Sequence, residues 1–469
     1  MPLSPESEAF AFAVPTPEQW RDSATKALKD KPLDSLLHLD ADHLAIRPLY
    51  AAATGVEPLF APRTTDAEGR AWDTRTLVEG EDPEVVNAAV LTDLEGGAAS
   101  VILSGAVLLD SEPLAKALAN VALELAAVGL DAGLDGPDAA NALAVLAKGS
   151  PRAKLMFHMD PISAFAEAGG SPRAISEHLS IAANTAERHA GAYPDATHFL
   201  ASGRVVHEAG GSAGQELGFA AASAVAYVKA AVEVGMSAEA ALKGVVLGVS
   251  VDAEYFDSLA KVRALRIIWA SVSKAFRLDV PANIEARSSR RMLAARDPWP
   301  NLLRLTAAGF AGAVGGADAV VLDGFTRASG RPDAFGRRQA RNTQLVLMEE
   351  ANLGRVDDPA AGSWFVDSRT HDLATAGWAE FQRIEREGGV IASLKGGAVQ
   401  MRVGASCAGL QAAFDNGAKQ IIGVTKFVDK DVRSAPVETS PVAATPAHVD
   451  ACEPLTSVRF AAAFEEAAQ

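Results

Sequence analysis

The sequence predicts an α/β protein built around a closed (β/α)8 (TIM) barrel, with an extended N-terminal arm and a short C-terminal tail. Short apolar runs alternate with long Ala-rich helical patterns along residues 91–430. Strands that are apolar on both faces indicate a parallel sheet covered by helices. Seven or eight such units in one segment favour a closed barrel. A doubly wound sheet is the alternative, but it is weakened because no glycine-rich phosphate loop follows an early strand.

Residues 1–90 are predicted to form the arm and an interface segment, since they show little regular repetition. A helix is expected to begin at Thr16, which can cap its N-terminus, while Pro17 suits the first turn and Gln19 can complete a capping box. Trp20 gives this helix an apolar residue for docking onto a partner surface.

The barrel is predicted to occupy residues 91–430. Seven segments have the composition of buried strands, namely 98–105, 127–133, 154–160, 197–203, 244–252, 280–286 and 317–324. An eighth strand is placed near 352–358. Residues 218–236 and 256–276 are the longest of the helical patterns between them.

Residues 431–469 are predicted to form a Pro/Ala-rich linker and a terminal helix. The linker is rich in Pro, Ser, Thr and Ala, which is typical of extended chain. Phe460 and Phe464 are four residues apart and would share one face of the helix.

Composition excludes several classes of function. The net charge of −16, without a basic stripe, argues against nucleic acid as a partner. Cys407 and Cys452 are too few for a disulfide framework or a metal cluster, so a reducing compartment is expected. The first twenty residues carry no apolar signal core, and no apolar stretch is long enough to span a membrane. We therefore expect a soluble cytoplasmic protein.

The stretch 200–220, LASGRVVHEAGGSAGQELGFA, begins at the end of the predicted strand 197–203 and continues into the following loop, where barrel enzymes carry their chemistry. His207 and Glu208 could form a general base with its orienting partner. Neighbouring residues at a strand end usually point apart, however. The favoured interpretation is a histidine packed at the barrel rim, with Glu208 solvated or capping a helix.

Several segments resemble the methylmalonyl-CoA mutase family. The stretch from residue 200 resembles the family's Ser-Gly-Tyr-His-x-x-Glu-Ala-Gly-Ala. Residues 341–366 are similar to its Arg-Asn-Thr-Gln and Asp-Pro-x-x-Gly-Ser segments, and IIGVTKF at 421–427 matches the end of its substrate domain. The resemblance covers about residues 55–430. It implies a barrel with coenzyme A threading its axis and adenosylcobalamin capping its mouth.

The departures from the family pattern fall on active-site positions. The family's Tyr-His becomes Arg204-Val205, His207 stands where the family has glutamine, and Leu77 replaces an active-site tyrosine. Valine offers no donor for a thioester carbonyl. The small hydroxyl residues that line the family's axial channel give way to larger charged ones, namely Glu285, Arg287 and Arg290. We expect no catalytic residues and a filled barrel.

The family's cobalt-ligating Asp-x-His-x-x-Gly does not occur, since none of the nine histidines has an aspartate two residues before it. We therefore expect no cofactor-binding or metal-binding residues on this chain. The patterns AWDTRTL at 71–77 and DPWPNLLR at 297–304 resemble those of the family's small, non-catalytic subunits. The resemblance implies a heterodimer whose large catalytic subunit carries adenosylcobalamin and is stabilised by this chain.

Two alternatives stay open. One is an active acyl-CoA mutase substrate chain whose cobalamin domain lies on a separate polypeptide, against which Val205 and Leu77 argue. The other is a barrel with a new cobalamin-independent activity that uses His207, Glu208 and Arg204.

Overall fold

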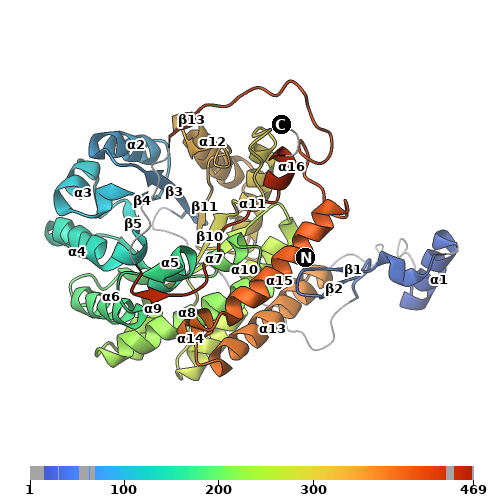
Figure 1. The fold of residues 1–469 in the computed structure, drawn as a ribbon, viewed down its shortest axis with the longest axis horizontal. Coiled ribbons are helices and arrows are strands. Elements are labelled where there is room, and N and C mark those ends of the chain that lie inside the picture. Colours follow the sequence, from blue (N-terminus) through green and yellow to red (C-terminus); the bar gives the residue numbers. More distant parts are fainter. Residues whose placement is uncertain (1–14, 30, 52–62, 64–68, 440–447, 467–469) are drawn as a thin grey trace, which may run out of the picture.

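Eight parallel strands close into a barrel at the centre of the molecule, which confirms the predicted fold class (Figure 1). The structure is a computed structural model, and it describes residues 15–29, 31–51, 63, 69–439 and 448–466. The order around the barrel is β10-β11-β3-β4-β5-β6-β8-β9. The strands are β3 (Asp73–Glu79), β4 (Ser100–Ser104), β5 (Ala127–Asp131), β6 (Leu155–Met159), β8 (Thr197–Ser202), β9 (Val245–Val251), β10 (Ile284–Ser288) and β11 (Ala319–Val321).

Seven of these strands overlap the seven predicted segments, but the eighth lies elsewhere. It is β3, within the residues assigned to the N-terminal arm, and its neighbours in the barrel are β11 and β4. The placement of a strand near 352–358 was wrong, because that segment forms turns. The inward face of β3 carries Asp73 and Arg75, so its sequence is not a continuous apolar run.

Helices surround the barrel, and further helices form a second layer on one side (Figure 1). α8 is buried on nearly every face because α13 covers the side turned away from the strands. Gly218 of α8 lies against Glu380, and Gly377 of α13 lies against Leu217, so the two helices approach closely. The main helices are α2 (Pro83–Glu95), α3 (Ser111–Ala117), α4 (Gly136–Leu146), α6 (Ile175–Ala190), α8 (Ala213–Glu233), α10 (Tyr255–Ala275), α11 (Asn301–Val314), α12 (Ala334–Leu345), α13 (Trp364–Arg386) and α15 (Ala398–Asp415).

Short elements complete the connections. The short α-helices are α5 (Pro161–Ala168), α7 (Arg204–Glu208), α9 (Ala238–Lys243) and α14 (Val390–Lys395). The 3₁₀-helices are η2 (Leu33–Leu36), η3 (Ala106–Leu108), η4 (Gly133–Asp135) and η5 (Ala147–Gly149). One π-helical turn, η6 (Val346–Glu350), follows α12. Among the described residues, no helix combines the length and apolarity needed to cross a membrane.

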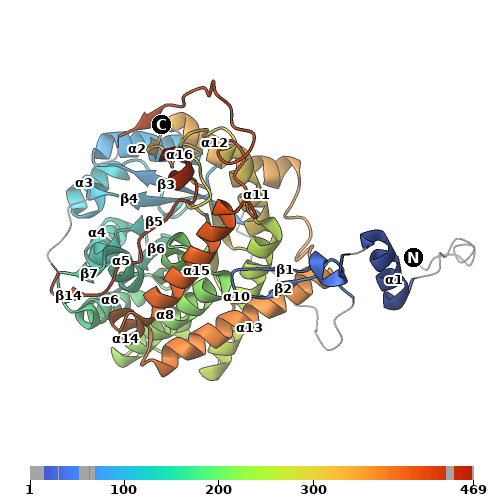
Figure 2. The ribbon, with the colours of Figure 1, turned by 45° about the vertical axis from the view of Figure 1, so that its right-hand side comes forward.

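The N-terminal helix α1 (Pro17–Leu28) projects away from the barrel, as both ribbon views show (Figures 1 and 2). The predicted capping box is confirmed, with the Thr16 side chain accepting from Gln19 N and the Gln19 side chain accepting from Thr16 N. None of the twelve residues of α1 is buried, Trp20 included. This helix therefore owes little to packing against the rest of the chain.

The segment after α1 is anchored to the barrel. β1 (His38–Leu39) and β2 (Ala45–Ile46) form a small antiparallel pair, and Asp42 lies in the turn between them. The Asp42 carboxylate accepts hydrogen bonds from Ser212 Oγ and from Gly214 N at the start of α8. The anchored hairpin thus fixes where the projecting α1 begins.

The C-terminal tail runs along the rim of the barrel mouth, over the connections that follow β6, β8 and β10 (Figure 2). Leu455 N donates to Ala166 O at 2.8 Å, and Val458 N donates to Glu208 O at 2.7 Å. Phe460 is buried just before the terminal helix rather than within it. The tail elements and their partner strands are β13 (Val437–Glu438) on β12 (Arg331–Pro332), β14 (Asp450–Ala451) on β7 (Gly170–Ser171), and α16 (Ala462–Glu466).

Candidate functional site

The candidate residues lie at the carboxyl ends of the barrel strands, where barrel enzymes hold their substrates. Glu285 and Arg287 are on β10, and Arg290 follows it. Arg204, Val205 and His207 form most of the short helix α7, which follows β8. Leu77 is on β3.

An ion pair crosses the interior of the barrel at this end. Arg287 Nη1 lies 2.9 Å from Asp131 Oδ2, and the two residues belong to β10 and β5, which are diametrically opposite in the strand order. Arg287 Nε also donates to Glu285 Oε1 at 2.5 Å. The axis is therefore occupied by charged side chains at the level of Arg287.

Arg75 extends this network from β3. Its guanidinium contacts Glu285 Oε2 at 2.5 Å, Asp73 Oδ2 at 2.6 Å and Ser100 Oγ at 2.9 Å. Burial alone would raise the pKa of Glu285, but Arg287 and Arg75 hold that pKa well below its usual range. Glu285 is thus a charged, fully engaged residue of the barrel core.

Sequence reasoning missed Asp73, Ser100 and Asp131 as members of this network, and also His158 on β6 beside it. The alternation of Asp73 and Arg75 on one face of β3 was the available signal, because charges at inward positions of a strand require partners. Asp131 carried no comparable signal, since its partner Arg287 is 156 residues away in the chain.

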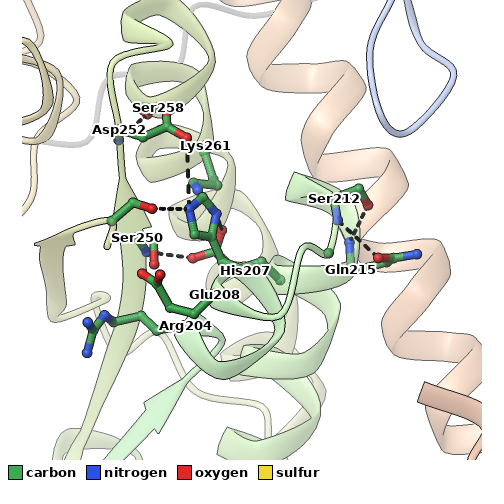
Figure 3. A network of polar contacts seen from close by, with 12 residues as sticks. Arg204, His207, Glu208, Ser212, Gln215, Ser250, Asp252, Ser258 and Lys261 are labelled. Atoms are coloured by element: carbon green, nitrogen blue, oxygen red, sulfur yellow. Dashed lines mark hydrogen bonds and ion pairs between the residues drawn. The ribbon is translucent and has the colours of Figure 1, made fainter. Parts of the chain in front are cut away.

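His207 is buried, and its ring joins a second network (Figure 3). Its Nδ1 lies 3.2 Å from Glu216 Oε2, and its Nε2 lies 2.9 Å from Ser289 Oγ. Glu216 is also held by Lys261 Nζ at 2.5 Å and by Ser250 N at 2.5 Å. Burial lowers the pKa of His207, and the nearby cations Arg291 and Lys261 lower it further.

The order Ser289–His207–Glu216 has the connectivity of a hydrolase triad. All three side chains are buried, however, and Ser289 is 0% exposed. A nucleophile needs room for a substrate carbonyl beside its oxygen, and Lys261 already engages the acid. The arrangement is that of a polar core network that ties α7, α8 and α10 together.

Glu208 faces a different set of partners from its neighbour. Its carboxylate accepts hydrogen bonds from Arg290 N and Arg291 N at 3.0–3.1 Å, which fixes the loop after β10. Figure 3 shows Arg204 pointing away from the His207 ring. The structure therefore does not bring His207, Glu208 and Arg204 together as one reacting group.

Leu77 and Val205 are apolar at positions where the resemblance implies polar active-site residues. Leu77 lines a small cleft between β3, β11 and α12, along with Glu79, Asp323 and Arg327. Arg327 bridges the two carboxylates there. Val205 packs against the main hydrophobic core. Neither side chain can donate a hydrogen bond.

No cluster of His, Cys, Asp or Glu suited to hold a metal ion occurs within the described part of the chain. Cys407 and Cys452 are free thiols. Cys407 packs against the apolar cluster that includes Phe460 of the tail, and Cys452 lies beside Phe165 of α5.

The sequence was compared with known proteins. The family model for methylmalonyl-CoA mutase matches residues 139–468. The chain is 36% identical over 466 residues to the methylmalonyl-CoA mutase small subunit of Streptomyces virginiae, which covers 94% of this chain and 74% of that protein. The chain belongs to the methylmalonyl-CoA mutase family.

Further members of this mutase family show where the chain lies within it. The chain is 33% identical to the small subunit from Propionibacterium freudenreichii subsp. shermanii, over 95% of this chain and 74% of that protein. Identity falls to 26% with the methylmalonyl-CoA mutase of Escherichia coli K12, over 87% of this chain and 64% of that protein. The chain is thus more similar to these mutase small subunits than to that mutase.

Proposed function

We propose that this chain is the non-catalytic small subunit of a heterodimeric methylmalonyl-CoA mutase, in which a large subunit isomerises methylmalonyl-CoA and succinyl-CoA. The Arg287–Asp131 pair carries the proposal, because it crosses the axis along which coenzyme A passes in mutases of this family. Val205 and Leu77 stand where the family has its catalytic histidine and tyrosine. The proposal places the complex in the cytoplasm.

Adenosylcobalamin belongs on the partner in this proposal, since the residues at this barrel mouth do not fit it. The two histidines described at this end, His158 and His207, are both buried, so neither ring can reach a metal held outside the strands. The tail occupies the rim through Leu455 and Val458.

The partner-binding role rests on the arm. α1 has no fully buried residue in this chain, and its apolar Trp20 and Leu28 are only half-buried. Leu39 and Leu49 beyond it are also exposed. Burying apolar surface contributes roughly 25 cal/mol per Å² before ordering costs. An arm of this kind would add substantial contact area to an interface between two barrels.

The decisive experiment expresses the large subunit with and without this chain. We expect the large subunit alone to have a lower thermal midpoint and a lower mutase rate. Equal values in both preparations, with no complex on size exclusion at micromolar concentration, would contradict the proposal.

Deletion of residues 1–31 tests the arm. The deletion should weaken the complex while leaving the thermal midpoint of the isolated chain unchanged, because α1 packs against so little of it. A fall in the midpoint of the isolated chain would show instead that the arm stabilises its own barrel.

The purified chain with adenosylcobalamin and methylmalonyl-CoA should form no succinyl-CoA, and its titration with cobalamin should leave the visible spectrum of the free cofactor unchanged. Turnover by the isolated chain would favour the alternative of an active substrate chain. Turnover without cobalamin that disappears in His207→Ala would favour a new activity.

A further inference from the structure

Four buried polar atoms at the mouth of the barrel have no hydrogen-bond partner among the described residues. They are Nε of Arg204, Nη2 of Arg287 and both ring nitrogens of His158. His158 is 5% exposed and Arg287 is 4% exposed. Buried donors without partners are costly, and buried charges more so. Such groups therefore indicate a missing partner.

The atoms surround one place. Arg287 binds Glu285 and Asp131, and the same two carboxylates act on the His158 ring. Burial lowers the pKa of Arg204, and Arg287 and Arg290 lower it further, while the carboxylates of Glu208 and Asp131 act in the opposite direction. Arg204 therefore lies at the same end of the barrel as Arg287, Arg290 and Asp131.

The neighbouring carboxylates already have partners. Glu285 is shared by Arg75 and Arg287, and Asp131 is bound to Arg287. Glu208 accepts two backbone N–H groups, and Asp323 is bound to Arg290 and Arg327. Among the described residues, Arg204 forms no ion pair with a carboxylate, whereas Arg75, Arg287, Arg290 and Arg327 each do.

Exposed and buried side chains both belong to this group. The side chains of Asp131 and Arg290 are each 44% exposed. His158, Glu285 and Arg287 are its buried members. A ligand would therefore enter from the mouth and could not pass through to the far end of the barrel.

The backbone of β6 directs His158 into this place. His158 has φ of 45°, a left-handed backbone conformation that residues other than glycine rarely adopt. The pairing of β6 with β8 shifts register between Met156 and Met159, on either side of it. Bulges and strained residues of this kind are frequent beside binding sites.

We propose that the mouth of the barrel binds a small oxyanion, a carboxylate or a phosphate, between the guanidinium groups of Arg204 and Arg287 and one N–H of His158. Planar guanidinium groups match the geometry of both anions. This proposal goes beyond the role as a small subunit, because it needs neither a partner chain nor mutase chemistry.

Thermal unfolding of the full chain tests the proposal. The unfolding temperature is measured in chloride and then with phosphate or malonate added at constant ionic strength. We expect a saturable rise with at least one oxyanion, and the anion that saturates at lower concentration identifies the class. Arg204→Met should abolish the rise, yet unfold no earlier than wild type in chloride, because it breaks no ion pair.

Two further variants separate a binding site from a structural role. Arg204→Lys keeps the charge without the planar fork, so it should show a smaller rise. Arg152→Met removes an exposed arginine elsewhere and should keep the full rise. The proposal is overturned if neither oxyanion acts, if Arg204→Met keeps the rise, or if that variant unfolds earlier in chloride.

Discussion

Arg287 and Asp131 stand on opposite strands of the barrel, and their side chains meet at 2.9 Å in its interior. The interior of a barrel of this kind is usually filled by layers of aliphatic side chains. Here part of the interior consists of ion pairs that involve Asp73, Arg75 and Glu285 as well. Removing one member of a buried ion pair is strongly destabilising, because the charge that remains is buried without compensation.

Replacing Arg287 should destabilise the chain strongly. Arg287→Met removes a buried partner from Glu285, and breaking a buried pair in this way costs about 3–5 kcal/mol. Chemical denaturation measures the loss in unfolding free energy. Adding Glu285→Gln to this variant should recover part of it, since the buried carboxylate is then neutral. Two strictly additive losses would contradict the pairing.

Phe460 should hold the tail in place. It stacks on Phe414 with ring centroids 5.0 Å apart and belongs to the apolar cluster against which Cys407 packs. Phe460→Ala should reduce the free energy that holds the tail in place by about 3 kcal/mol, as is common for buried phenylalanines. Cys407 should then react faster with a thiol reagent. Phe427, which is 76% exposed, provides the control, and Phe427→Ala should leave that reaction rate unchanged.

Asp160 should make stability fall as pH rises. Burial raises its pKa to about 6 from the ordinary value of 3.8, although Tyr227, Ser163 and Ser202 donate to it. The folded state therefore binds the proton more tightly, so the contribution is full below about pH 3.8 and is lost as pH rises through about 6.

Asp160→Asn tests this dependence, since asparagine stays neutral and still caps α5. The difference in unfolding free energy between the variant and wild type should shift in favour of the variant as pH rises from 4 to 6.5, by at most about 3 kcal/mol. Asp195→Asn, at an exposed position, should show no such gain. A constant difference across this range would mean that Asp160 does not titrate there.

His207 should behave as a structural residue. His207→Ala removes the His207 contact of Ser289 Oγ and one of the contacts of Glu216, which keeps Lys261 and Ser250 N, so a loss of about 2–3 kcal/mol is expected from the broken hydrogen bonds and the cavity. His207→Gln, which keeps polar atoms, should lose less. Once either variant is assembled with the large subunit, its mutase rate per complex should match wild type. A selective loss of rate would point to chemistry at His207.

Much of the barrel could be predicted because its strands are nearly continuous apolar runs. β9, for example, is buried at all seven positions, and its nearly continuous apolar sequence predicts this burial. β3 could not be found in this way, since Asp73 and Arg75 interrupt its pattern and make sense only beside Ser100 and Glu285. The separation of His207 from Glu208 was predicted correctly, but the partners of each were not.

The sequence by itself determined the barrel, the membership of the family and the loss of polar groups at Leu77 and Val205. Only the tertiary structure decided that Arg287 meets Asp131, that His158 faces the same place and that the tail follows the barrel rim. The physical reason lies in the range of each signal. Periodicity and composition report how a residue faces its own strand or helix. Closing the barrel brings β10 opposite β5, and no local pattern records which distant side chains then meet.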